Sequence, residues 1–179
     1  MAKSPAKAGA PVRDPASVPS LPPHWISIAR GYLGIRETPG LANNPKVIDF
    51  FVKAGHAEIH EDSTPWCAAF VGAVLKDAGL RGTGSLWALS YATWGQKLAG
   101  PAIGAIATKK RVGGGHVFFV VGFDKSNVYG LGGNQNDQVS IATFSRASIN
   151  SYRWPPDMPL PKLVASAGQA AGVANVREA

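Results

Sequence analysis

The order of the hydrophobic patterns constrains the fold of this chain more than any other feature. Up to about residue 95, apolar residues recur at helical spacing in segments that stop at glycine. Beyond residue 104 they form short β-rich runs separated by turn residues. Helices followed by strands with short links predict an α+β fold with an antiparallel sheet of about five strands.

Four helices and five strands are expected. The helices are residues 22–33, a segment opened by Asn44-Pro45 and ended by Gly55, the apolar run 66–80, and a segment from Ser85 to Trp94. The strands are residues 105–108, 117–123, 128–131, 139–144 and 149–154. The run 66–80 has only Lys76 and Asp77 as charges, so we expect it to be a central helix packed across one face of the sheet.

The chain has 179 residues, enough for one core, and a domain over residues 21–157 is expected. Residues 1–20 have the composition of a flexible arm, and residues 158–179 form a tail rich in Pro, Ala and Gly. The sequence shows no secretory signal and no run long enough to cross a membrane. We expect a monomer made in the cytoplasm.

The net charge is +7, with 18 Lys and Arg against 11 Asp and Glu. This excess favours electrostatic contact with a polyanion such as an anionic cell envelope, although a basic surface without a specific partner is the alternative. No signature of specific nucleic-acid recognition accompanies the charge. A single cysteine also excludes the common zinc sites built from several thiolates.

Cys67 is that single cysteine, and it lies where a nucleophile would be placed. Thr64 is a favourable N-cap and Pro65 suits the first helical position, so Cys67 is expected in the first turn of a helix. Free backbone N–H groups and the helix dipole would lower the pKa of its thiol there. The alternative is a structural cysteine, since free Cys is among the most buried residue types.

His116 is the histidine best placed to act as a base for this thiol. It lies between three glycines and the apolar strand 117–122, at the mouth of a buried strand. The alternative is a histidine on a solvated rim. The other three histidines precede the Cys67 helix or begin the first helix, and we expect them to point elsewhere.

Strand register locates a third polar group. If residues 124–127 form a hairpin loop, Phe123 pairs with Val128, and counting back sets His116 opposite Gln135, to within one residue. A histidine that faces a polar side chain on the paired strand can be held in one orientation. Together with Cys67 and His116, this position predicts a Cys–His–polar triad.

The polar block 132–137 offers three candidates for this position. Asn134 or Gln135 would hold the imidazole tautomer without charging the ring, whereas Asp137 would raise its basicity. The alternative reading is an Asn/Gly-rich turn.

Three blocks, residues 64–71, 115–122 and 131–135, together carry a family resemblance. They resemble the CHAP and NlpC/P60-like cysteine amidases of peptidoglycan, most of all the small, often phage-encoded members. The stretches 34–40 and 43–45 near the start and 152–155 near the end are similar to this group too. The resemblance covers residues 24–155.

The resemblance implies a papain-like α+β fold and a peptidoglycan hydrolase. Some relatives bind calcium through clustered acids, but this chain shows no such loop, so we expect no metal and no cofactor. Cys67 would be the nucleophile, His116 the base and Asn134 the residue that orients the base. The expected substrate contacts are Glu37, Trp66, Trp94 and Gln135, although the two tryptophans also suit a core. One departure from the family is Gly104-Ala105, where many members carry Gly-Asp.

The bond cut would be the N-acetylmuramoyl-L-alanine amide or a bond within the stem peptide. A phage endolysin that reaches the cell wall, in the periplasm, after holin-type release is the expected biological role. The alternatives are an antibacterial amidase effector delivered by a secretion system, and a non-catalytic wall-binding or virion structural protein of the same fold.

Overall fold

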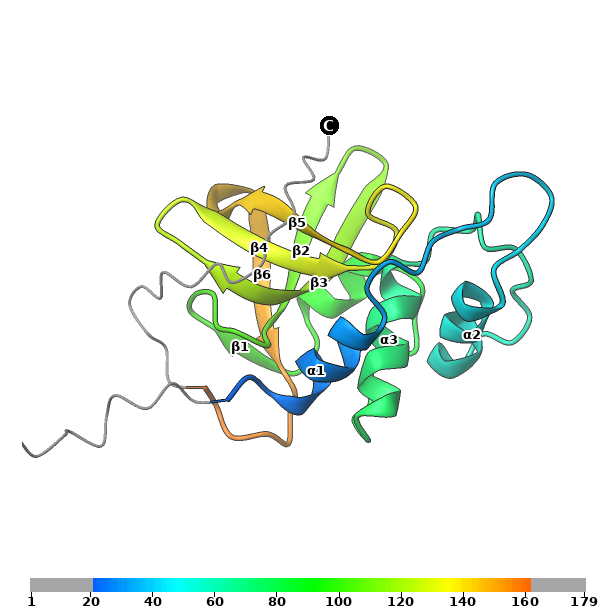
Figure 1. Ribbon diagram of the computed structural model, residues 1–179. Helices are drawn as coiled ribbons and strands as arrows, with labels where there is room; N and C mark the ends of the chain where they lie inside the picture. The colour runs from blue at the N-terminus through cyan, green and yellow to red at the C-terminus, as the bar shows by residue number, and fades with distance from the viewer. Residues whose placement is uncertain (1–20, 162–179) are drawn as a thin grey trace, which may run out of the picture.

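The computed structural model describes residues 21–161, in which helices pack on a six-stranded antiparallel sheet (Figure 1). The α+β class predicted from the sequence is therefore confirmed. The expected arm at residues 1–20 and residues 162–179 of the expected tail lie outside the described residues. Within residues 21–161, no helix combines the length and apolar character needed to cross a membrane.

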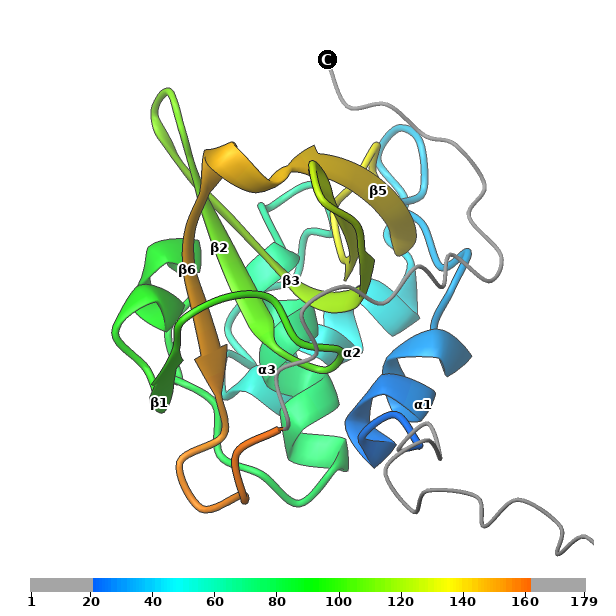
Figure 2. The ribbon, with the colours of Figure 1, turned by 90° about the vertical axis from the view of Figure 1, so that its left-hand side faces the viewer.

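The α-helices lie together on one side of the sheet, and Figure 2 shows this layering from a second direction. They are α1 (His24–Gly31), α2 (Pro45–Ala54) and α3 (Cys67–Asp77). The second begins and ends as predicted: the Asn44 side chain accepts a 2.9 Å hydrogen bond from the Lys46 N–H, and Gly55 closes the helix in the left-handed region.

The predicted fourth helix is instead a short 3₁₀ segment, η2 (Ala88–Ala92). The Ser85 side chain accepts from the Trp87 N–H at 3.1 Å, which closes a local turn instead of capping an α-helix. The chain then enters a strand that the sequence did not predict, β1 (Gln96–Leu98), which pairs with the last strand.

The remaining strands match the predicted ones to within two or three residues at their ends. They are β2 (Ile106–Arg111), β3 (Gly114–Phe123), β4 (Asn127–Gly132), β5 (Ser140–Ser145) and β6 (Ile149–Trp154), with a 3₁₀ turn η3 (Arg146–Ser148) before β6. Their order across the sheet is β1-β6-β2-β3-β4-β5. Strand β3, which carries His116, is thus flanked on both sides.

The hairpin register is confirmed at its turn, where Phe123 pairs with Val128. A bulge between Val120 and Gly122 then shifts the register by one residue, and the ladder ends at the Phe119–Leu131 pair. The pairing of β3 with β4 therefore stops before His116, and strand register alone does not identify the residue that faces it.

Helix α3 is central, as predicted, because it is buried on nearly every side. It packs against α1, α2 and β3. Phe70 makes edge-to-face contacts with Phe50 of α2 at 5.4 Å and with Phe119 of β3 at 6.2 Å between ring centroids. These contacts fix the start of α3 against the sheet.

The chain just past the expected domain end at residue 157 is hydrogen-bonded to the domain. The Gln96 side chain donates to the Met158 carbonyl at 2.8 Å, and the Trp154 indole donates to the Pro159 carbonyl at 2.9 Å.

Candidate active site

Cys67 is the first residue of α3, so the expected helix start at Thr64 and Pro65 is wrong by two residues. Residues 61–64 form a turn, closed by a hydrogen bond from the Thr64 N–H to the Glu61 carbonyl, and helical bonding starts only at the Trp66 carbonyl. No side chain caps the helix. The first backbone N–H groups of α3, that of Cys67 included, therefore have no acceptor within the helix.

The backbone N–H of Val117, the residue after His116 on β3, lies close enough to the Cys67 thiol to lower its pKa. The thiol therefore lies near the strand that carries the histidine. The thiol side of the site is nearly closed to solvent, with Cys67 8% exposed.

His116 is fully buried, and each of its two ring nitrogens has a different environment. Nε2 lies 3.0 Å from the Gln135 side-chain oxygen Oε1. Nδ1 has no hydrogen-bond partner among the described residues. The ring also lies against Phe118 and Phe144, at 5.6 and 5.8 Å between centroids.

Gln135 is held in one orientation, and that orientation sets the histidine tautomer. Its amide nitrogen donates to the Ser140 carbonyl at 2.7 Å and to the Gly130 carbonyl at 3.3 Å. The amide oxygen must then face His116, so the proton of the neutral ring is on Nε2. Nδ1 consequently carries a lone pair, which is the state a base requires.

Burial keeps both members of the pair uncharged at rest. Desolvation lowers the pKa of His116 to about 3, although the Gln135 hydrogen bond acts in the opposite direction. Desolvation also raises the pKa of the Cys67 thiol, and the Val117 N–H and the charge of Arg111 offset this only in part. The expectation of a lowered thiol pKa is therefore wrong, because loss of water outweighs the helix terminus.

Asn134, to which the resemblance assigns the orienting role, lies in a tight turn beside the residue that contacts the ring. Asn134, Asn136 and Asp137 all adopt positive φ, between 52° and 57°, which Asn and Asp tolerate better than most residues. The turn is closed by a 3.0 Å bond from the Gln135 N–H to the Gln138 carbonyl. The structure thus brings Gln135, and not Asn134 or Asp137, to the histidine.

The expected substrate contacts differ in their surroundings. The Trp66 ring is fully buried and stacks on Phe50 at 5.7 Å, so it belongs to the core and offers no surface to a substrate. Glu37 accepts a 2.7 Å hydrogen bond from the Trp66 indole, and burial raises the pKa of its carboxyl. Trp94 is half-buried, lies against Tyr91 and lines a hollow of about 660 Å³.

Several contributors to the site gave no signal in the sequence. The carbonyls of Gly130 and Ser140 orient Gln135, and the Val117 N–H lowers the pKa of the Cys67 thiol, but any residue supplies such groups. Arg111 lies at the end of β2 and lowers the pKa of both Cys67 and His116 through its charge.

Residues 21–161 contain no group of three or more His, Cys, Asp or Glu side chains able to hold a metal ion. The chain was compared with protein-family models, with curated proteins and with solved structures, and none of the three comparisons gave a match.

Proposed function

We propose that this protein is a cysteine hydrolase with a papain-like fold that cuts an amide bond of peptidoglycan. The observation that carries the proposal is the locked Gln135 amide. It leaves Nδ1 of His116 without a hydrogen-bond partner, and the backbone N–H of the next residue, Val117, is near enough to the Cys67 thiol to lower its pKa. A purely structural core gains nothing from a buried nitrogen without a partner, since such an atom costs stability.

In the proposed reaction, the Cys67 sulfur attacks the amide carbonyl carbon while the thiol proton passes to His116 Nδ1. Since burial disfavours both the free thiolate and the imidazolium, the proton transfer accompanies the attack and does not precede it. The N–H groups at the start of α3, which no side chain caps, are the donors for the oxyanion that forms.

The intermediate then collapses, the carbon–nitrogen bond breaks, and His116 returns the proton to the leaving amine. A water molecule gives its proton to Nδ1 and attacks the thioester, which releases the acid and restores the thiol. Gln135 keeps the ring in place through both steps and accepts from Nε2–H throughout. No cofactor enters this sequence.

Peptidoglycan as the substrate rests on the resemblance of the blocks around Cys67, His116 and Gln135 to wall amidases. The net charge of +7 suits an anionic envelope. A phage endolysin is the role we propose, with a delivered antibacterial amidase as the alternative.

The test is digestion of purified peptidoglycan by the wild type and by Cys67→Ala, with released fragments identified by mass spectrometry. We expect fragments from the wild type alone, and their new ends name the bond that is cut. Equal release by both proteins would refute the Cys67 nucleophile.

The burial of Cys67 favours a second candidate function. In this candidate, the protein has the same fold but is a non-catalytic wall-binding or virion structural protein. Two hollows of about 370 and 660 Å³ in the described surface are lined by neither Cys67 nor His116. Binding of folded wild-type protein to peptidoglycan without release of fragments would support this candidate.

A further inference from the structure

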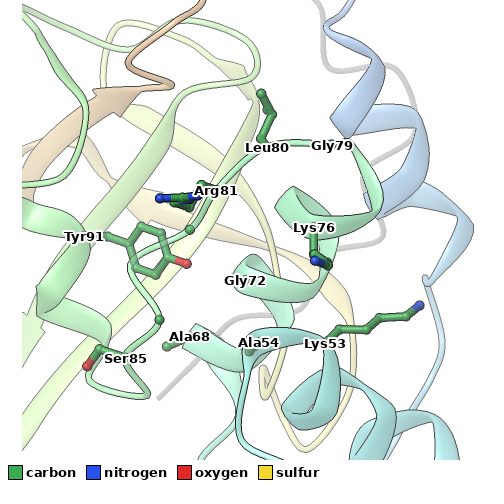
Figure 3. Close-up of a pocket in the computed structure, with 12 residues that line it drawn as sticks. Lys53, Ala54, Ala68, Gly72, Lys76, Gly79, Leu80, Arg81, Ser85 and Tyr91 are labelled. Carbon is green, nitrogen blue, oxygen red and sulfur yellow. The ribbon is translucent and has the colours of Figure 1, made fainter.

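A hollow of about 370 Å³ lies beside α3, and we call it the α2–α3 hollow (Figure 3). Ala54 at the end of α2, the segment 79–85 and Tyr91 form its other walls. From α3 it is lined by Ala68, Gly72 and Lys76, which are four residues apart and so share one side of the helix. The hollow thus runs along α3 from the residue after Cys67 towards the end of the helix.

Two glycines let the walls of this hollow lie close together. A Cβ atom at Gly72 would lie 3.1 Å from the Ala54 Cβ, and one at Gly82 would lie 2.8 Å from the Tyr91 hydroxyl oxygen. Burial raises the pKa of Tyr91 to about 12, so this hydroxyl remains neutral near pH 7. The wall is therefore formed mainly by backbone, small side chains and a neutral hydroxyl.

The charge around the α2–α3 hollow is positive and only partly compensated. Lys53 is already engaged, since its Nζ lies 3.1 Å from carboxylate oxygens of both Asp49 and Asp77, and Figure 3 shows its side chain extending away from Tyr91. The side chains of Lys76 and Arg81 have no hydrogen-bond or ion-pair partner within residues 21–161. None of the described residues that line the hollow is acidic.

We propose that the α2–α3 hollow binds a carboxylate group of the peptide part of the substrate, held by Lys76 and Arg81. This inference rests on the proposed function, because it assigns a role to the space beside the nucleophile. A guanidinium suits a carboxylate through two parallel N–H donors, and an ammonium adds a point charge.

Helix geometry sets how far this carboxylate lies from the bond that is cut. Ala68 and Lys76 are eight residues apart, or about 12 Å at the helical rise of about 1.5 Å per residue. An extended peptide advances about 3.3 Å per residue. Because this is the separation along the helix axis only, the carboxylate would lie at least about three to four residues from the scissile amide.

Direct binding tests the hollow without relying on turnover. The probes are N-acetyl-tetra-alanine with a free carboxylate and the same peptide with a C-terminal amide, titrated by NMR into full-length Cys67→Ala protein. We expect the carboxylate form to bind about tenfold more tightly, and the double change Lys76→Gln with Arg81→Gln to remove that preference. Lys125→Gln, which removes an exposed charge in a hairpin loop, is the matched control and should retain it.

The proposal is overturned if both probes bind equally, or if Lys125→Gln loses the preference as well. Tighter binding of inorganic phosphate at the same residues would replace the peptide carboxylate with a phosphate ligand. Circular dichroism on each variant confirms that the variants are folded.

Kinetics on peptidoglycan fragments separates this inference from the proposed function. With Cys67 intact, the double variant should raise KM about tenfold and leave kcat unchanged. Hydrolysis without any carboxylate preference overturns only the proposal that the α2–α3 hollow binds a carboxylate. A carboxylate preference without hydrolysis by the wild type overturns the proposed function alone.

Discussion

The Cys67–His116–Gln135 site and the α2–α3 hollow lie on different sides of the same helix, and they treat charge in opposite ways. At the first, burial removes charge: the thiol and imidazole are neutral, and the polar contacts around Gln135 are satisfied. At the second, Lys76 and Arg81 are exposed, charged and without partners among the described residues.

Under the proposed function, one short helix serves two purposes. A group that must take up and release a proton benefits from a dry environment in which its tautomer is fixed. A group that must attract an anion from solution benefits from exposure, where its charge costs little desolvation. Changes in the first region are thus expected to lower kcat, and changes in the second to raise KM.

The largest expected effect comes from the buried region. Cys67→Ala should lower peptidoglycan hydrolysis at least about a thousandfold, because no other thiol is present in the chain. Fragment release measured by mass spectrometry checks this, with the Lys76→Gln and Arg81→Gln double variant as the comparison that keeps its kcat. Residual activity within tenfold of the wild type would contradict the assignment.

Loss of the orienting amide should have the next largest effect. Gln135→Leu removes the acceptor for His116 Nε2–H and leaves the Ser140 carbonyl without its 2.7 Å donor. We expect kcat to fall about 10- to 100-fold, in line with other residues that orient an imidazole. Steady-state kinetics of the folded variant measures it, and an unchanged kcat would exclude a positioning role.

Gln135→Glu is the conservative comparison for Gln135→Leu, and its effect is measured as the pH dependence of kcat. A carboxylate stabilises imidazolium, so the pKa of His116 should rise from about 3 and the acid limb of kcat should move to higher pH. A profile that coincides with that of the wild type would show that residue 135 does not control the base.

The buried histidine should also make stability depend on pH. Its pKa is about 3 in the folded chain and about 6.5 when unfolded, so unfolding takes up a proton in between. Its contribution is complete above about pH 6.5 and is lost as pH falls, by about 1.4 kcal/mol per unit near pH 5. Urea unfolding at several pH values measures this, and His116→Gln should show a shallower slope.

The smallest expected effect comes from changes to Glu37. These variants show whether Glu37 stabilises the core or contacts the substrate. Glu37→Ala leaves the buried Trp66 indole N–H without its acceptor and should cost about 1–2 kcal/mol of stability. Glu37→Gln keeps an acceptor oxygen and should cost less. Both variants should retain the wild-type KM, and a raised KM in the folded Gln variant would instead support Glu37 as a substrate contact.

The sequence predicted the elements that depend on neighbouring residues. The cap of α2 at Asn44, its end at Gly55 and the Phe123–Val128 turn of the hairpin are confirmed, because each rests on contacts within a few residues. Strand β1 was not predicted from the sequence, and the segment after Ser85 was wrongly predicted to be a full helix. Pairing with β6 and a local serine turn decided those segments, and neither has a periodic signal.

The candidate site divides in the same way. The residue types and their order along the chain, Cys67, then His116, then a polar block, were determined by the sequence itself. Which member of the block meets the ring was decided by tertiary structure, since a bulge ends the register count and the carbonyls of Gly130 and Ser140 select Gln135. The neutral state of Cys67 was decided there too, because desolvation depends on what packs around the thiol and not on its place in a helix.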